Sequence, residues 1–157
     1  MYIEYFMFII QKKNMNIALI IAGGCGKRMG QEIPKQFIQV NGKPIIIYTL
    51  EAFQNCPNID AIEIVCIEGW EEILKAYIKQ YKISKLKWLV KGGKTVQESI
   101  RNGVYNLKDK CDDDDIIVIH DSIRPMIDQD VLSDVLVKCS KHGNAVTSLP
   151  YYEQIFY

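Results

Sequence analysis

Residues 16–30 read Asn-Ile-Ala-Leu-Ile-Ile-Ala-Gly-Gly-Cys-Gly-Lys-Arg-Met-Gly, a short apolar run followed directly by a glycine-rich segment. The apolar part, residues 16–22, shows no alternation of polar and apolar side chains. Such a run is typical of a strand that is buried on both faces of a parallel sheet. The glycines that follow allow a tight turn and a close approach of backbone N–H groups to an anion. The stretch therefore predicts a central parallel strand that ends in a loop suited to anions.

The rest of the chain alternates between helices and strands. Further strands are expected at residues 61–67, 86–90, 116–119 and 144–149, and helices at residues 44–53, 69–81, from 95 onward and from 128 to about 143. This alternation predicts an α/β fold, a three-layer α/β/α sandwich with a mostly parallel, Rossmann-like sheet. Ligands in such folds bind beyond the carboxyl ends of the strands. The loops after Ala22, Val90 and Ile119 are therefore the places where a site is expected.

The helix that begins after residue 95 has a clear start signal. Thr95 and Glu98 have the spacing of a capping box, in which each side chain bonds the backbone at the other position. The buried stripe expected for this helix consists of Val96, Ile100, Val104 and Leu107.

Composition excludes several classes of protein. The chain has 157 residues with 19 basic and 19 acidic side chains, so its formal charge is zero. A neutral chain has no global attraction to nucleic acid or to an anionic membrane, and neither is expected as a partner. Five widely spaced cysteines without a CxxC pair argue against a disulfide framework or a structural zinc site. They indicate a reducing, cytoplasmic location.

The two ends of the chain differ from its middle. Residues 1–10 are apolar and aromatic, but they are too few to span a bilayer, and no basic residue precedes them as in a signal peptide. Residues 1–14 are expected to be an extension before one domain of residues 15–157; the alternative is an edge strand or short helix packed on the core. Residues 150–157 are apolar and aromatic and include no terminal helix. We therefore expect that the domain lacks its carboxy-terminal part.

Three cations lie in or near the glycine-rich segment, namely Lys27, Arg28 and Lys35. Backbone N–H groups together with cationic side chains are what a triphosphate requires. The P-loop motif is excluded, because Arg28 stands where that motif has its serine or threonine. The dinucleotide fingerprint is excluded as well, because Met29 stands where its third glycine belongs. A tight turn without a ligand is the alternative for the glycines alone.

Asp121 is the candidate metal ligand. It follows the apolar strand of residues 116–119, at the edge where ligands bind. A carboxylate beside a polyphosphate is a natural oxygen ligand for Mg²⁺, although an aspartate can also cap a turn or a helix there. The acidic run of residues 112–115 precedes the same strand and is expected to be a solvated loop.

Three motifs, taken together, resemble one enzyme family. Ala-Gly-Gly-x-Gly-x-Arg-Met at residues 22–29 with Pro-Lys-Gln-Phe at 34–37 is similar to the amino-terminal signature of the 2-C-methyl-D-erythritol 4-phosphate and ribitol-5-phosphate cytidylyltransferases. The glycine pair at residues 92–93 followed by Ser99 agrees in order and spacing. So does His-Asp-Ser-Ile-Arg-Pro at residues 120–125.

The resemblance implies the nucleotide-diphosphosugar transferase fold and the transfer of CMP from CTP to a polyol phosphate with release of pyrophosphate. By position, Arg28 and Lys35 match the family's catalytic cations, and Asp121 matches its Mg²⁺ ligand. The positions that match the nucleotide site are Ala22, Gly23, Gly24, Cys25, Gly26 and Lys27 in the loop, and Gly92, Gly93, Ser99, Ser122 and Arg124 farther along the chain.

Some positions depart from the family pattern. Val96 stands where the family often has an arginine. The resemblance also implies a homodimer built through a carboxy-terminal arm, and residues 150–157 correspond only to the start of that arm, so dimerisation of this chain is left open. The acceptor is 2-C-methyl-D-erythritol 4-phosphate, for isoprenoid precursors, or ribitol 5-phosphate, for wall polymers. The alternatives are a truncated, non-catalytic nucleotide-binding fragment and a nucleotidyltransferase with another base or sugar phosphate.

Overall fold

The computed structural model describes residues 14–24 and 33–148. In chain order its elements are β1 (Asn16–Ala22), the 3₁₀ helix η2 (Lys35–Phe37), β2 (Gln39–Val40), β3 (Lys43–Pro44), α1 (Ile45–Asn55), β4 (Ala61–Cys66), α2 (Glu71–Gln80), β5 (Leu86–Lys91), α3 (Val96–Leu107), β6 (Ile116–Asp121) and α4 (Gln129–His142). The first four predicted strands are confirmed to within two residues, and the four predicted helices are confirmed as well. None of the helices in these ranges is long and apolar enough to cross a membrane.

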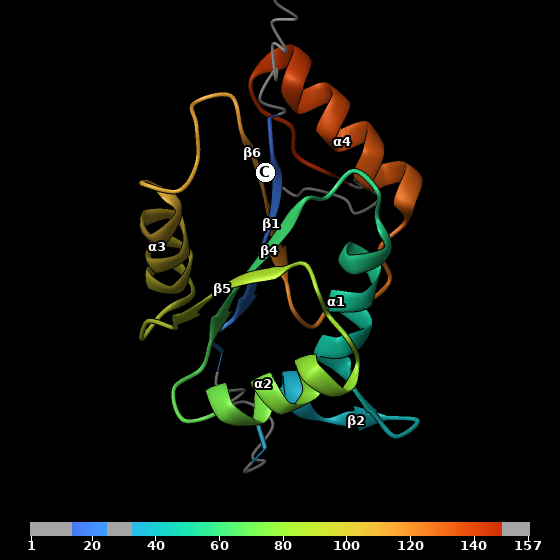
Figure 1. Cartoon of the computed structure of the whole chain (residues 1–157), viewed down its shortest axis with the longest axis vertical. Coiled ribbons are helices and arrows are strands. Elements are labelled where there is room, and N and C mark those ends of the chain that lie inside the picture. Colours follow the sequence, from blue (N-terminus) through green and yellow to red (C-terminus); the bar gives the residue numbers. More distant parts are fainter. Residues whose placement is uncertain (1–13, 25–32, 149–157) are drawn as a thin grey trace, which may run out of the picture.

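The four long strands form one sheet in the order β5-β4-β1-β6, and all neighbouring pairs are parallel. β1 lies inside the sheet, with Ala22 opposite Cys66 of β4 and Ile21 opposite Asp121 of β6. The chain first builds outward from β1 to β4 and β5, and then returns to the other side of β1 with β6 (Figure 1). Ligands in open α/β sheets bind where the strand order reverses, which here is the carboxyl end of β1.

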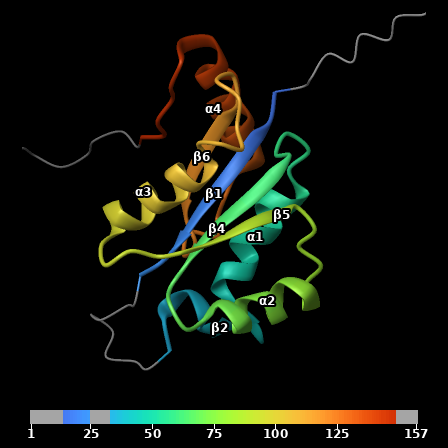
Figure 2. The same ribbon diagram turned by 60° about the vertical axis from the view of Figure 1, so that its left-hand side comes forward.

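Helices cover both faces of the sheet, so the predicted three-layer sandwich is confirmed. Ile17, Leu19 and Ile21 of β1 point to the face covered by α3. The alternate residues of β1 point to the opposite face, where they pack with residues of α1, α2 and α4. Figures 1 and 2 show α3 on the other side of the sheet from α1. Because both faces are covered, β1 has no polar side to solvent, which is why residues 16–22 show no alternation.

The predicted fifth strand is wrong for the residues that the structure describes. Residues 144–148 form no strand, and Leu149 lies outside the described ranges. Ala145, Val146 and Thr147 line an apolar hollow beside β6 without pairing with it, and Val146 is 89% exposed. An apolar run becomes a strand only where a neighbouring backbone can complete its hydrogen-bond ladder. Within the described part of the chain, β6 pairs with β1 alone.

Helix α3 confirms its predicted start and most of its predicted stripe. The Thr95 side chain accepts a hydrogen bond from the Glu98 N–H at 3.1 Å, as expected for a helix cap. Leu107 is buried, and Ile100 and Val104 are partly buried against the core. Val96 is the exception, because it is 55% exposed. The other buried residues of α3 are Ser99 and Gly103. The helix lies close to the sheet at Gly103, where an added Cβ would lie 2.6 Å from Leu19 Cδ1. Val96 lies two turns before Gly103 on the same side of the helix, and it is exposed as the first residue of α3.

Candidate functional site

The carboxyl ends of the strands are joined by hydrogen bonds that continue past the strands themselves. The Ile67 N–H donates to the Ala22 carbonyl oxygen at 3.0 Å, and the Gly92 N–H donates to the Cys66 carbonyl oxygen at 2.7 Å. On the other side of β1, the Ser122 N–H donates to the Ile21 carbonyl oxygen at 3.0 Å. The loops after β1, β4, β5 and β6 therefore begin side by side at one edge of the sheet.

Two glycine segments, residues 23–24 and residues 92–93, touch at this edge, although they lie far apart in the sequence. A Cβ on Gly92 would lie 3.0 Å from the Gly23 Cα and 3.0 Å from the Cys66 carbonyl oxygen. A Cβ on Gly23 would lie 2.6 Å from Ser99 Oγ and 3.4 Å from the Gly92 Cα. The first and third predicted strands thus bring their glycines together. A Cβ at Gly23 would force Ser99 to shift, and a Cβ at Gly92 would be tightly packed against backbone atoms.

Ser99 fastens the second glycine segment to the start of α3. Its hydroxyl accepts a hydrogen bond from the Gly93 N–H at 3.0 Å and donates to the Thr95 carbonyl oxygen at 3.0 Å. The residue is 2% exposed, and Gly93 packs directly on Glu98. We call the carboxyl edge of the sheet around the two glycine segments, residues 23–24 and 92–93, the glycine edge. Ser99, expected in the nucleotide pocket, is buried beside this edge, and its hydroxyl already makes two hydrogen bonds.

The 3₁₀ helix η2 presents Lys35 next to this edge. Phe37 is 4% exposed, and its ring stacks on Trp70 with centroids 4.7 Å apart and planes 23° apart. The Phe37 N–H donates to the Pro34 carbonyl oxygen at 2.8 Å, which closes the turn. Lys35 is half-buried at the start of this anchored turn.

Gln36 is a site residue that reasoning from the sequence missed. Its side-chain amide donates to the Ala22 carbonyl oxygen at 2.8 Å and to the Gly24 carbonyl oxygen at 3.0 Å. The residue is 1% exposed. The only signal in the sequence was its place in the Pro-Lys-Gln-Phe motif, because a neutral amide does not stand out as a candidate for catalysis or charge binding.

The turn after β6 carries the candidate metal ligand and its neighbours. Asp121 Oδ2 pairs with Arg124 Nε at 2.9 Å, and both side chains are substantially exposed, at 45% and 73%. His120 Nε2 lies 2.9 Å from the Arg124 carbonyl oxygen. Ser122 is buried, and its carbonyl oxygen accepts a hydrogen bond from the Thr49 hydroxyl at 2.8 Å. The turn is therefore held by its backbone, while Asp121 and Arg124 reach solvent.

Asp121 fits a magnesium ion that is held mainly by a ligand's phosphates. Within residues 14–24 and 33–148, no three His, Cys, Asp or Glu side chains gather as a metal cluster. Mg²⁺ in nucleotide sites commonly keeps several waters and uses one or two carboxylates together with substrate phosphates. One exposed carboxylate at the edge of the sheet meets that requirement.

Cys66, the last residue of β4, is a buried cysteine at this edge of the sheet. Burial, with a smaller contribution from Glu71, raises the pKa of Cys66 to about 12. A thiol with this pKa is protonated at neutral pH and is a poor nucleophile. Cys66 therefore acts here as a small core residue opposite Ala22.

Part of the expected site lies outside the described residues. Cys25, Gly26, Lys27 and Arg28 belong to residues 25–32, which the structure does not describe. Among the described candidates, Ala22, Gly23, Gly92, Gly93 and Ser99 form one packed group joined by the contacts given above, and Gly24 is linked to that group through Gln36.

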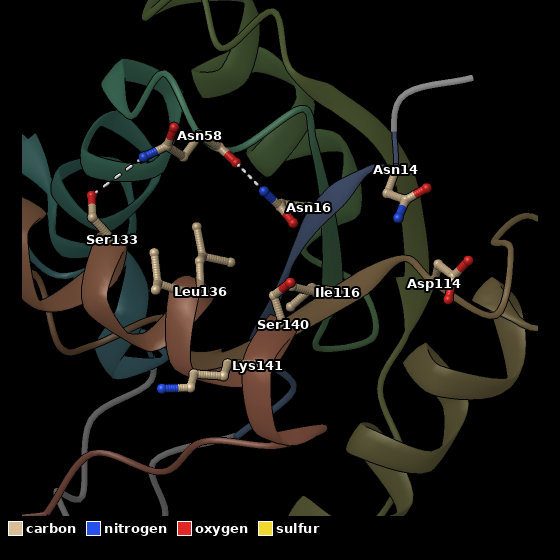
Figure 3. A pocket seen from close by; sticks show the side chains of 10 residues that line it. Asn14, Asn16, Asn58, Asp114, Ile116, Ser133, Leu136, Ser140 and Lys141 are labelled. Carbon is tan, nitrogen blue, oxygen red and sulfur yellow. Dashed lines mark hydrogen bonds between the residues drawn. The ribbon is translucent and has the colours of Figure 1, made fainter. Parts of the chain in front are cut away.

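A hollow of about 840 Å³ lies at the opposite edge of the sheet. It is lined by Asn16 and Ile116, the first residues of β1 and β6, and by residues of α4. Figure 3 shows Asn58 bridging two of its walls, through bonds from Asn16 and to Ser133. Because the glycines, Lys35 and Asp121 all belong to the carboxyl edge, the hollow at the amino edge is not the predicted site.

Comparison with known proteins gives a consistent answer. The family model for 2-C-methyl-D-erythritol 4-phosphate cytidylyltransferase matches residues 16–156. The chain is 60% identical to a ribitol-5-phosphate cytidylyltransferase of Lacticaseibacillus paracasei over 142 residues, which are 90% of this chain and 61% of that protein. It is 37% identical to a 2-C-methyl-D-erythritol 4-phosphate cytidylyltransferase of Clostridium botulinum over 134 residues, 85% of this chain and 57% of that protein.

Solved structures agree with the fold. A 2-C-methyl-D-erythritol 4-phosphate cytidylyltransferase of Francisella tularensis superimposes with a TM-score of 0.60 at 30% identity, covering 78% of this chain and 51% of that one. A 4-diphosphocytidyl-2C-methyl-D-erythritol synthase superimposes with a TM-score of 0.68 at 23% identity, covering 83% of this chain and 56% of that one. The chain thus spans about 60% of the length of the curated relatives it matches. The chain belongs to the 2-C-methyl-D-erythritol 4-phosphate cytidylyltransferase family.

Proposed function

We propose that this chain binds CTP at the carboxyl edge of its sheet and takes part in the transfer of CMP to a polyol phosphate. The observation that carries the proposal is the packed contact between Gly23 and Gly92, next to the turn that bears Asp121. Close-packed glycines from two loops leave backbone atoms uncovered by side chains at the place where a ligand binds in this class of sheet. Family membership supports CTP as that ligand.

In the proposed reaction, a phosphate oxygen of the acceptor attacks the α-phosphorus of CTP. A new P–O bond forms, the bond from the α-phosphorus to the bridging oxygen breaks, and pyrophosphate leaves with the electron pair. The protein's share of such a reaction is to hold the reactants in line and to offset the charge that develops. Lys35 and Arg28 are the proposed catalytic cations, with Lys35 carried on the anchored turn η2.

The remaining residues of the proposed site bind the nucleotide and its metal. Asp121 would hold Mg²⁺, which would supply positive charge next to the triphosphate. The nucleotide contacts are proposed for Gly92, Gly93, Ser99, Ser122 and Arg124, and for the loop residues Ala22, Gly23, Gly24, Cys25, Gly26 and Lys27.

Ribitol 5-phosphate is the proposed acceptor. The support is the difference in identity: 60% to a relative named ribitol-5-phosphate cytidylyltransferase, against 37% to one named for 2-C-methyl-D-erythritol 4-phosphate. We also propose a cytoplasmic location. Its support is that the cysteines described by the structure, Cys56, Cys66, Cys111 and Cys139, are free thiols, as is usual in a reducing compartment.

Calorimetric titration tests the nucleotide site. The protein is titrated with CTP, UTP, ATP and GTP, each with Mg²⁺, and CTP should bind with clear preference. Asp121→Asn should weaken CTP binding, whereas Asp134→Asn should not, although Asp134 has a comparable exposed ion pair, with Lys138 in α4. Equal binding of all four nucleotides, or equal loss in both variants, would contradict the assignment.

Turnover tests the reaction and its acceptor. Pyrophosphate release from CTP is measured with ribitol 5-phosphate and with 2-C-methyl-D-erythritol 4-phosphate, and the first should be the better substrate. Lys35→Ala should lower kcat by a factor of ~10² or more, the effect of losing a group that stabilises transition-state charge. Lys75→Ala is the control, because Lys75 is exposed on α2 and pairs only with Glu72 in the described structure. A preference for the erythritol derivative would overturn the choice of acceptor, but not the nucleotide site.

A further inference from the structure

We infer that Gln36 is a positioning residue that joins the end of β1 to the turn carrying Lys35, and so sets the geometry of the glycine edge before a ligand binds. The inference rests on the function proposed above, because it assigns Gln36 to the CTP site. Gln36 does not reach the reacting atoms in this role. It acts through the backbone of Ala22 and Gly24 and through its neighbour Lys35.

One nitrogen makes both contacts. Gln36 Nε2 has two hydrogens, and its neighbours at 2.8 Å and 3.0 Å are the carbonyl oxygens of Ala22 and Gly24. The Ala22 oxygen also accepts a hydrogen bond from the N–H of Ile67, the residue after β4, at 3.0 Å. This one oxygen therefore accepts from the segment after β4 and from η2. The last backbone hydrogen bond beyond β1 and β4 and the hydrogen bond from Gln36 are thus accepted by the same atom.

Burial makes these contacts selective for an amide. Gln36 is 1% exposed, so water cannot replace a lost donor without rearrangement of the site. A glutamate has almost the same shape, but its ionised oxygens would face two carbonyl oxygens and could donate to neither. A leucine fills a similar volume and leaves both carbonyl oxygens without this donor.

The contacts also fix where Lys35 stands. Gln36 follows Lys35 directly in η2, and Phe37 anchors the same turn by stacking on Trp70 at 4.7 Å. The bonds to Ala22 and Gly24 therefore tie the backbone next to Lys35 to the first residues of the glycine loop. Catalysis by positioning is sensitive to such links, since a displacement of about 1 Å can cost on the order of 10²-fold in rate.

The test compares Gln36→Leu and Gln36→Glu with Gln54→Leu. Gln54 is the control, because its partly exposed side chain also joins two segments, through Ser84 Oγ at 3.0 Å and the Lys85 N–H at 2.9 Å, but at the amino edge of the sheet. Hydrogen exchange of a peptide that covers residues 22–30 is measured without nucleotide. CTP affinity with Mg²⁺ is measured by calorimetry on the same preparations, and kcat and KM are measured with ribitol 5-phosphate.

In the Gln36 variants, exchange in residues 22–30 should be roughly fivefold to thirtyfold faster, the factor expected for the loss of one or two hydrogen bonds. Exchange in α2 should stay unchanged, which shows that the variants remain folded. The CTP dissociation constant should rise in the Gln36 variants and not in Gln54→Leu. The Glu variant should be at least as impaired as the Leu variant, because it adds repulsion to the loss of donors.

The outcomes separate this inference from the proposed function. Unchanged exchange and affinity in Gln36→Leu would overturn the positioning role. Faster exchange with unchanged CTP affinity and kcat would also overturn it, since Gln36 would then be a structural residue only. If the unsubstituted protein binds no CTP, the proposed function fails, and the exchange experiment still decides whether Gln36 holds the glycine edge.

Discussion

Replacing Gly23 by alanine tests the packing of the glycine edge directly. The new Cβ would lie 2.6 Å from Ser99 Oγ and 3.3 Å from Ser99 Cβ. Ser99 could rotate its hydroxyl away, but it would then lose its bonds to the Gly93 N–H and the Thr95 carbonyl oxygen, both 3.0 Å long. The substitution therefore forces either an overlap or the loss of the contact that holds the second glycine segment.

The overlap and the lost hydrogen bond would lower the free energy of unfolding by similar amounts. Overpacking a tight interior typically costs about 1–3 kcal/mol. Leaving a buried donor such as the Gly93 N–H without its acceptor costs about 1–3 kcal/mol as well. At about 2–4 °C per kcal/mol for a chain of this size, the Tm of Gly23→Ala should fall by roughly 2–12 °C.

The matched control is Gly24→Ala, because an added Cβ at Gly24 meets no described atom within 4 Å. Thermal unfolding of both variants is followed by circular dichroism, and the CTP dissociation constant is measured well below the lower Tm. Gly23→Ala should be destabilised and should bind CTP more weakly, whereas Gly24→Ala should keep the Tm of the unsubstituted protein. Equal Tm values for the two variants would refute the packing argument.

A double substitution identifies the clashing atom. Ser99→Ala removes Oγ, so in Gly23→Ala/Ser99→Ala the closest remaining Ser99 contact is the one at 3.3 Å to Cβ. The double variant should therefore be less destabilised than the sum of the two single variants, with a coupling free energy of about 0.5–3 kcal/mol. Strict additivity would show that the cost of Gly23→Ala arises elsewhere.

Three further predictions concern the core and the helices. Gly103→Ala should lower Tm although alanine favours helices by about 1 kcal/mol, because its Cβ would lie 2.6 Å from Leu19 Cδ1 and 2.9 Å from Val65 Cγ2; a higher Tm would refute this. Burial raises the pKa of Glu63 above its usual 4.5, so the folded protein loses stability as pH rises from about 4.5 through the raised pKa, and Glu63→Gln should flatten the dependence of Tm on pH in that window. Asp128→Ala removes the cap of α4 and should cost about 0.5–2 kcal/mol in urea unfolding, whereas Asp130→Ala should cost less.

The strands could be predicted from the sequence because a strand that is buried on both faces consists almost entirely of apolar residues. Residues 16–22 and 61–66 are uninterrupted or nearly uninterrupted apolar runs, and both lie inside the sheet. Residues 144–149 are a weaker case, because Asn144, Thr147 and Ser148 interrupt the apolar side chains. A strand also needs a partner backbone, which a local pattern does not specify, and residues 144–148 lie outside the sheet.

The buried face of helix α3 could be predicted only in part from the apolar pattern. The apolar pattern predicts that Val96 is buried, but Val96 is 55% exposed. Besides Leu107, the buried residues of α3 are Ser99 and Gly103, which carry little or no apolar signal. They are buried because α3 approaches β1 and β4 too closely for larger residues. Small residues at a close contact have to be found in the structure.

The candidate site could be predicted only as a set of motifs, and the structure divides that set into two kinds of residue. Gly23 and Gly92 are partly buried and pack against each other, whereas Ser99 and Gln36 are almost fully buried. A loss of activity in variants of these residues does not by itself reveal a ligand contact, because each substitution also disturbs the edge. Arg124, whose side chain is 73% exposed, can be replaced without disturbing the core.

Ligand contact and preorganisation must therefore be tested at different positions. At exposed residues such as Lys75 and Arg124, substitution changes little more than charge, since exposed ion pairs contribute about 0–1 kcal/mol to stability. A loss of CTP affinity in Arg124→Ala at an unchanged Tm would therefore report contact with the nucleotide. At Gln36 and Ser99 affinity and local exchange should change together, because there the protein acts on the ligand through its own backbone. A variant of Ser99 that lost affinity with no change in exchange would place its hydroxyl against the nucleotide, as the family resemblance implies.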